Sequence, residues 1–177
     1  MKNFLEHLST YAEYHRDQRN IWTHFVGVPM IVFAVIVLLS RPTFEIATYS
    51  ITPAIIGFVL SMVFYLRLNL VFGLIMAVLM GAGLYAANSL AAMSTTVWLS
   101  TGVGMFVVGW IIQFVGHHYE GKKPAFVDDL VGLMIGPLFV TAEILFALGM
   151  FKSLEQQIEQ RAGKVRPYPS DATATQK

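Results

Sequence analysis

The sequence predicts an all-α integral membrane protein, a helical bundle of four to five hydrophobic spans in which the last segment is re-entrant or broken. Of the 177 residues, 55% are hydrophobic and only 13% are charged, whereas charged residues make up about a quarter of a typical soluble domain. Five apolar runs also have about the length that a helix needs to cross a bilayer. We expect a membrane helical domain over residues 1–151 and a polar tail over residues 152–177, with a disordered end.

The composition excludes several classes of function. A net charge of +1 provides no basic field for binding nucleic acid. Because the chain has no cysteine, a metal ion would have to bind to His, Asp, Glu or backbone oxygen. The polar N-terminus lacks the order of segments found in a signal peptide, so we expect the first span to direct membrane insertion.

The N-terminal stretch predicts a short helix that lies at the membrane interface. Four of its residues recur every three or four positions and therefore share one helix face. They are Phe4, Leu8, Tyr11 and His15. Asn20 is a plausible N-cap for the first apolar run. The five apolar runs cover residues 21–39, 46–66, 70–87, 97–115 and 130–151.

The fifth apolar run does not fit a simple crossing. Lys and Arg are enriched in short cytoplasmic loops, and the basic N-terminal stretch places that end of the chain in the cytoplasm. Four crossings return residues 116–126 to the same side, whereas a fifth would leave the basic tail outside. We expect Gly136-Pro137 to break the fifth run into a re-entrant or bent helix, which is tolerated where it is buried against protein or lines a cavity.

Two polar stretches at this membrane face carry most of the histidines. His15 and His24 are nine residues apart, so a straight helix would point them to opposite sides. A turn within residues 16–20 would instead fold the two imidazoles together. Asn20 shares a helix face with His24, and it acts either as the helix cap or as a hydrogen-bond partner of that histidine.

The other polar stretch follows the fourth apolar run. His117 and Glu120 share a face if the helix continues through them, and His118 then points about 100° away. A histidine beside a carboxylate is a common metal-binding or acid/base pair. Lys122 and Lys123 either attract the carboxylate of a lipid or acyl chain or only set the topology.

We interpret the two stretches as a metal site. The alternative for any one histidine is an interfacial residue that hydrogen-bonds to the backbone, but four of the five histidines lie in stretches that face one side. Whether His7 takes part stays open. Asp128 and Asp129 either orient a ligand or are helix N-terminal acids. Glu143 is expected to face the bundle interior, either paired or protonated.

Several templates for membrane enzymes are absent. The chain has no His-Glu-x-x-His, Gly-x-Ser-x-Gly or P-loop motif, which argues against the corresponding proteases, hydrolases and nucleotide-binding enzymes. Five histidines are also too few for the clustered boxes of membrane di-iron enzymes. A mononuclear site fits this count, and imidazole ligands suit iron and zinc alike.

A set of short motifs is spread over most of the chain outside the tail. They are Tyr14-His15, Asn20-Ile21, His24, Pro29, Gln113 to His117, Glu120, Pro124-Ala125 and Gly136-Pro137. In these motifs the chain resembles the Mpo1-like family of small membrane proteins. The resemblance implies an iron(II)-dependent dioxygenase that shortens 2-hydroxy long-chain fatty acids by one carbon, as in fatty-acid α-oxidation.

The resemblance also assigns roles to residues. His15, His24 and His117 match the family's histidines and would bind Fe(2+), with His118 as the alternative to His117. Glu120 would be a hydrogen-bond partner of a ligand or an acid/base group. The implied partners are a 2-hydroxy fatty acid, O2 and the lipid bilayer, and either lysine of the second stretch would neutralise the substrate carboxylate.

A rival hypothesis comes from another class of protein. A non-catalytic membrane scaffold or small transporter would use the histidines for a structural zinc site, and the broken last run is typical of transport pathways. For either function we expect a bacterial inner membrane, or the endoplasmic reticulum in a eukaryote, with the site on the cytoplasmic side. A homo-oligomer is compatible with both.

Overall fold

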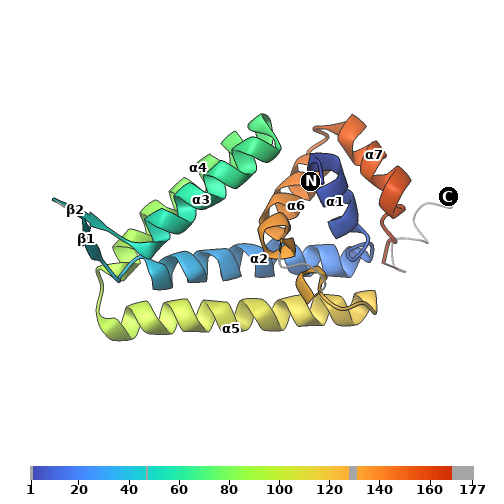
Figure 1. Ribbon diagram of the computed structural model, residues 1–177. Helices are drawn as coiled ribbons and strands as arrows, with labels where there is room; N and C mark the ends of the chain where they lie inside the picture. Colours follow the sequence, from blue (N-terminus) through green and yellow to red (C-terminus); the bar gives the residue numbers. More distant parts are fainter. Residues whose placement is uncertain (1, 47, 128–130, 169–177) are drawn as a thin grey trace. The chain divides into compact units, whose positions relative to one another are not determined.

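The computed structural model describes residues 2–46, 48–127 and 131–168, and it is helical over most of them. This confirms the all-α class (Figure 1). The helices of the described part are α1 (Phe4–Ala12), α2 (Gln18–Leu39), α3 (Pro53–Leu68), α4 (Leu70–Ala91), α5 (Thr95–Glu120), α6 (Gly132–Ala147) and α7 (Lys152–Ala162). A short antiparallel hairpin of β1 (Phe44–Ile46) and β2 (Tyr49–Ile51) lies between α2 and α3 in the chain. A 3₁₀ turn, η1 (Ala125–Val127), lies between α5 and α6.

Three of the described helices, α2, α4 and α5, are long and apolar enough to cross a membrane. Helices α6 and α7 meet the same test only as a pair, and they are bent by 119° at the break between them. By length and composition the described residues therefore hold three candidate spans, or four with the bent pair, and the bend confirms the broken last segment. The predicted acids Asp128 and Asp129 and the tail end, residues 169–177, lie outside the described residues.

The break in the last segment lies later than Gly136-Pro137. Helix α6 continues through Pro137, its sixth residue, where the proline removes one intrahelical hydrogen bond without ending the helix. The chain turns instead after α6, where Gly149 has a φ of 83° and Phe151 a φ of 54°. Glycine adopts this left-handed conformation without steric cost, so it ends the helix there.

The second predicted span begins later than its apolar run. Residues 44–46 and 49–51 form the two strands of the hairpin, and α3 starts at Pro53. The hydroxyl of Thr52 accepts a hydrogen bond from the Ile55 N–H at 3.3 Å and caps the helix. Proline is favoured at the first helical position because it has no N–H to satisfy, so this pair sets the boundary. The resulting α3 has 16 residues and is shorter than the three long helices.

The chain divides into two compact units, Met1–Val28 with Ile111–Lys177 and Pro29–Trp110. In the second unit α3 and α4 pack against each other (Figure 1). Asn69 ends α3 and also caps α4, because its side chain accepts a hydrogen bond from Phe72 N–H at 3.0 Å. One residue therefore makes the turn between two apolar helices.

The first unit holds most of the polar residues singled out in the sequence. Helix α1 packs against both α6 and α7 (Figure 1), and it buries Leu8 and Tyr11. A reciprocal pair caps its start, because Asn3 Oδ1 accepts from Glu6 N–H at 2.9 Å and Glu6 Oε2 accepts from Asn3 N–H at 2.8 Å. Helix α1 ends at Ala12, earlier than the predicted stretch to His15. We call residues 13–17, between α1 and α2, the histidine loop.

Gly73→Ala tests the close packing of α3 and α4. An added Cβ would lie 2.8 Å from Leu66 Cα and 2.9 Å from Leu66 N, both backbone atoms of α3, so the helices would have to separate. We expect a loss of about 1–3 kcal/mol in unfolding free energy, measured by thermal unfolding in detergent. Gly57→Ala is the control, since nothing lies within 4 Å of its added carbon. Equal destabilisation by both variants would contradict the packing described.

Candidate metal centre

Three buried histidines meet in the first unit. His15 comes from the histidine loop, His24 from the second turn of α2 and His117 from the end of α5. Each offers one ring nitrogen to a group whose members all lie within 4.8 Å of one another. The structure thus brings together three side chains separated by up to 102 positions (117 minus 15) in the sequence.

The hydrogen bonds of His15 and His24 fix their tautomers. His15 Nδ1 lies 2.7 Å from the Tyr11 carbonyl oxygen, and His24 Nδ1 lies 2.8 Å from the Asn20 carbonyl oxygen. A carbonyl oxygen only accepts, so both Nδ1 atoms carry the proton and donate it. In the neutral rings both Nε2 atoms are then left with lone pairs.

These two lone pairs face each other. The Nε2 atoms of His15 and His24 are 3.0 Å apart, and two acceptors at this distance in a buried site need a cation between or beside them. Burial, together with the nearby His24, holds the pKa of His15 well below 6.5, which disfavours an imidazolium as that cation. The arrangement fits a metal ion, which binds neutral imidazole.

His117 completes the group of three histidines that could hold a metal ion. Its ring centroid lies 5.0 Å from that of His15 and 5.1 Å from that of His24. Two nitrogens bound to one ion at about 2.1 Å are separated by roughly 3 to 4.2 Å, so the 3.0 Å pair already has a suitable spacing. We therefore conclude that the donor chemistry and the spacing of the three histidines, hereafter the triad, suit a single metal ion.

Aromatic side chains pack on His15 from the side of α1 and α6. The Tyr11 ring stacks on the imidazole with a centroid distance of 4.2 Å and an angle of 6°, and Phe139 lies 5.5 Å away. Burial raises the pKa of the Tyr11 phenol, which therefore stays neutral. Gly136 makes room for this ring, because a Cβ there would lie 2.9 Å from the Tyr11 hydroxyl oxygen.

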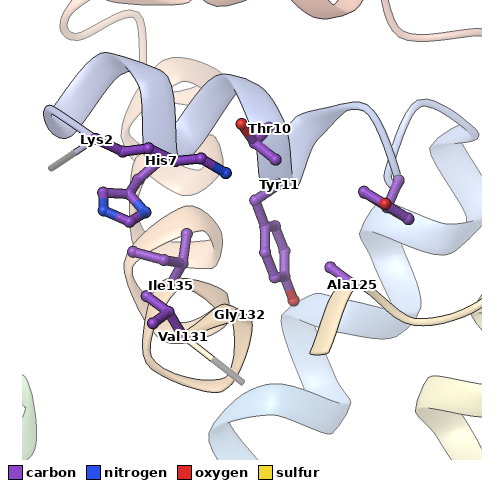
Figure 2. A pocket seen from close by; sticks show the side chains of 9 residues that line it. Lys2, His7, Thr10, Tyr11, Ala125, Val131, Gly132 and Ile135 are labelled. Atoms are coloured by element: carbon purple, nitrogen blue, oxygen red, sulfur yellow. The ribbon is translucent and has the colours of Figure 1, made fainter. Parts of the chain in front are cut away.

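Tyr11 also borders a cavity of about 350 Å³. Figure 2 shows the side chains of α1 on one side of it and those of α6 on the other, with the Tyr11 ring reaching toward Ala125. Polar groups from α1 line the cavity, among them His7 and Thr10. His7 thus faces this cavity, and it is not a member of the metal-binding group of the described residues.

A glycine lets α5 approach α2 at the triad. A Cβ on Gly116 would lie 2.5 Å from Asn20 Oδ1 and would overlap the hydroxyl of Thr23. A larger residue here would force the Asn20 and Thr23 side chains, or the helix that carries them, to shift. Gly116 directly precedes His117, so the same contact brings that histidine close to the helix that carries His24.

Glu120 holds the histidine loop against the end of α5. Its side chain is fully buried, and its Oε2 accepts hydrogen bonds from the backbone N–H groups of Arg16 at 2.9 Å and Asp17 at 2.7 Å. Oε1 accepts from Arg166 Nη2 at 2.6 Å. Among the described residues these partners do not include a triad imidazole, so the carboxylate acts on His15 through the backbone that follows it.

Asn20 links the same groups. Its Nδ2 donates to the Tyr14 carbonyl oxygen at 3.1 Å and to Glu120 Oε2 at 3.2 Å. Its own carbonyl oxygen accepts the hydrogen bond from His24 Nδ1. Asn20 lies inside α2 and is not its N-cap; it is a hydrogen-bond partner of His24 and an anchor for the loop that carries His15.

The other residues singled out in the sequence lie around the triad. His118 is exposed on α5 and outside the metal-binding group, and Lys122 and Lys123 are exposed after it. Lys122 Nζ donates to the Glu13 carbonyl oxygen at 2.8 Å, which ties it to the histidine loop. Glu143 is largely buried and paired with Arg16 at 3.2 Å.

Sequence analysis did not identify three residues that support the triad. Tyr11 was assigned only to a helix face, and Arg16 and Arg166 only to the basic segments of the chain. Arg16 donates to the carbonyl oxygens of Ala12 and His15 as well as to Glu143. The available signal was an arginine directly after a candidate ligand; in the folded protein Arg16 is buried, so its charge needs partners nearby.

Comparisons with known proteins agree with the motifs. A family model described as "Mpo1-like: 2-hydroxy-palmitic acid dioxygenase Mpo1-like" matches residues 1–148. The chain is 34% identical over 155 residues to the 2-hydroxy-palmitic acid dioxygenase MPO1 of Saccharomyces cerevisiae, an alignment that covers 86% of this chain and 85% of the yeast protein. No solved structure matches the chain.

His117→Ala and His118→Ala distinguish the two adjacent histidines. Because only His117 belongs to the buried group, we expect its loss to weaken metal binding by at least about tenfold, while His118→Ala binds like the unmodified protein. Titration with Co²⁺, followed by its visible absorption, measures both affinities. A larger loss in His118→Ala would contradict the assignment.

Proposed function

The chain belongs to the Mpo1-like family, and on that premise we propose that it is an iron(II)-dependent dioxygenase. Its substrates would be 2-hydroxy long-chain fatty acids, which it would shorten by one carbon. The name of the yeast relative supports the substrate class and the use of O2. The apolar helices support a membrane-bound substrate, since α2, α4 and α5 are each suited to a bilayer.

The observation that carries the proposal is the pair of Nε2 lone pairs that face each other in a buried site. Together with His117 they form an all-nitrogen donor set. When bound there, ferrous iron would supply the coordination positions that O2 and the hydroxyl and carboxylate groups of the substrate require. Three protein ligands leave such positions free, whereas a structural zinc site is closed by four.

The residues around the triad have distinct roles in this proposal. His15, His24 and His117 hold the ion as neutral imidazoles. Glu120 accepts from the backbone N–H of Arg16 and so holds the loop that carries His15. Asn20 donates to Glu120, and its carbonyl oxygen accepts the Nδ1 hydrogen bond of His24. The rings of Tyr11 and Phe139 pack on His15 and keep water from that side.

Lys122 is our choice for the substrate carboxylate, with Lys123 beside it. The Lys122 ammonium group already contacts the histidine loop, so an anion bound to it would lie near the loop that carries His15. We place the centre at the cytoplasmic edge of the membrane, where basic loop residues are favoured. For a bacterial protein this would be the inner membrane.

The non-catalytic alternative rests on the bend between α6 and α7. Broken helices line the pathways of many transporters, often around a buried acidic residue. Here Glu143 is paired with Arg16, so its charge is neutralised within the protein. This pairing favours a structural role for Glu143 and therefore the enzyme.

The direct test of the enzyme uses protein purified in detergent without oxygen. We expect about one iron per chain, which is what a single triad would hold. Addition of 2-hydroxypalmitate and air should then give O2 uptake and an acyl product that is one carbon shorter. The product should disappear in His24→Ala and persist in His118→Ala. Iron-loaded protein that consumes no O2 with this substrate would overturn the proposed reaction.

Lys122→Ala tests the proposed carboxylate contact. The ammonium group is exposed, and exposed charge pairs contribute about 0.2–1 kcal/mol, so we expect KM to rise about two- to fivefold with a smaller change in kcat. Lys122→Arg should restore KM because it keeps the charge. Arg161→Ala removes an exposed charge at the end of α7 and serves as the control. An unchanged KM in Lys122→Ala would exclude this contact.

A further inference from the structure

The segment that follows α7 returns to the histidine loop. Arg166 N–H donates to the Arg16 carbonyl oxygen at 2.7 Å, and the Arg166 carbonyl oxygen accepts from Gln18 N–H at 3.1 Å. These bonds form a parallel bridge that pairs Asp17 with Arg166. The polypeptide after α7 thus lies along the loop like a short added strand. We call residues 163–168 the C-terminal strap.

Side chains add three further links between the strap and the site. Arg166 Nη2 donates to Glu120 Oε1 at 2.6 Å. Arg16 Nη1 donates to the Gly163 carbonyl oxygen at 3.1 Å, and Tyr168 N–H donates to Gln18 Oε1 at 2.7 Å. The strap is therefore attached at its beginning, at its middle and at its end.

The strap directly follows α7, a helix that packs within the first unit. This helix packs against α1 and buries Ile158, so the strap starts from an element that is itself part of the first unit. Both α7 and the strap lie beyond residue 148, where the match to the family model ends. The contacts to the histidine loop thus come from a part of the chain that the family match does not include.

We propose that the strap positions the metal centre, with Arg166 as the positioning residue. The inference rests on the proposed function in one respect, namely that the triad binds a metal ion. Arg166 does not belong to the triad; it acts through Glu120, whose other oxygen holds the N–H groups of Arg16 and Asp17. His15 directly precedes those groups, so the strap determines where its imidazole lies.

The charges explain why Arg166 matters more than an ordinary exposed arginine. Its side chain is 57% exposed, but the Glu120 side chain that it contacts is fully buried. A buried carboxylate that loses its cationic partner is strongly disfavoured. Removing the guanidinium group therefore draws Glu120 toward solvent, away from the loop amides, and leaves His15 less constrained.

Arg166→Ala in the full-length protein is the first variant to test. Arg161→Ala is its matched control, because Arg161 is an exposed arginine at the end of α7. Arg166→Lys keeps the positive charge and should recover part of the loss. A pair of truncations separates the strap from the tail: ending the chain after Val165 removes Arg166, while ending it after Tyr168 keeps the whole strap.

Two measurements are made on each variant. The first is the affinity for Co²⁺, read from its visible absorption, which reports the ligand geometry without any need for turnover. The second is hydrogen exchange of the peptide that contains residues 13–18, made without metal. We expect Arg166→Ala and the chain that ends after Val165 to bind Co²⁺ about tenfold more weakly and to exchange faster in this peptide. Arg161→Ala and the chain that ends after Tyr168 should match the unmodified protein in both measurements.

The outcomes separate the strap from the proposed function. Unchanged Co²⁺ affinity and unchanged exchange in Arg166→Ala would overturn the strap proposal while leaving the metal centre intact. Faster exchange with unchanged Co²⁺ affinity would also overturn it, because the strap would then hold the loop without positioning a ligand. If the unmodified protein binds no Co²⁺ through the triad, the proposed function and the positioning role both fail, whereas faster exchange would still show that the strap holds the loop.

Discussion

The buried carboxylate of Glu120 is the interaction on which the site depends. Two of the triad histidines lie on helices, where the contact at Gly116 brings α5 and α2 together. His15 lies on a loop whose Tyr14 and His15 N–H groups bond back to Tyr11 and Ala12 of α1, but these bonds do not fix the loop against α5. Glu120 supplies that constraint by accepting hydrogen bonds from two loop N–H groups, from Asn20 and from Arg166. The one histidine of the triad that lies outside the helices is thereby held beside the other two.

The polar groups of the first unit form one connected network around the triad. Arg16 satisfies carbonyl oxygens on both sides of His15 and neutralises Glu143, while each Nδ1 of His15 and His24 finds a carbonyl oxygen. Buried polar groups are tolerated when every member has a partner. Among the described residues, Asn20 Oδ1 and His117 Nδ1 have no hydrogen-bond partner, and neither of the facing Nε2 atoms carries a proton to donate to the other. A metal ion would satisfy the two Nε2 lone pairs, so the centre of the network is suited to a cation.

Many of the helices, and the turn that brings His15 to His24, could be predicted from local patterns in the sequence. Apolar runs of membrane length predict α2, α4 and α5, and the turn between His15 and His24 follows from nine-residue spacing that no straight helix accommodates. The start of α3 at Pro53 and the bend at Gly149 depend on single residues whose effect competes with hydrophobicity. Contacts such as Arg166 with Glu120 or Phe139 with His15 have a different origin. They depend on which elements pack together, and neither periodicity nor composition reports that packing.

The central claim is that the three histidines bind one metal ion, and X-ray absorption of iron-loaded protein tests it most directly. The fine structure counts the atoms bound to iron and identifies imidazole from scattering by the outer ring atoms. The account predicts a shell of nitrogen and oxygen at about 2.1 Å that contains three imidazoles, falling to two in His15→Ala. A shell without imidazole, or one unchanged by that substitution, would contradict the claim and leave the histidines as buried polar residues.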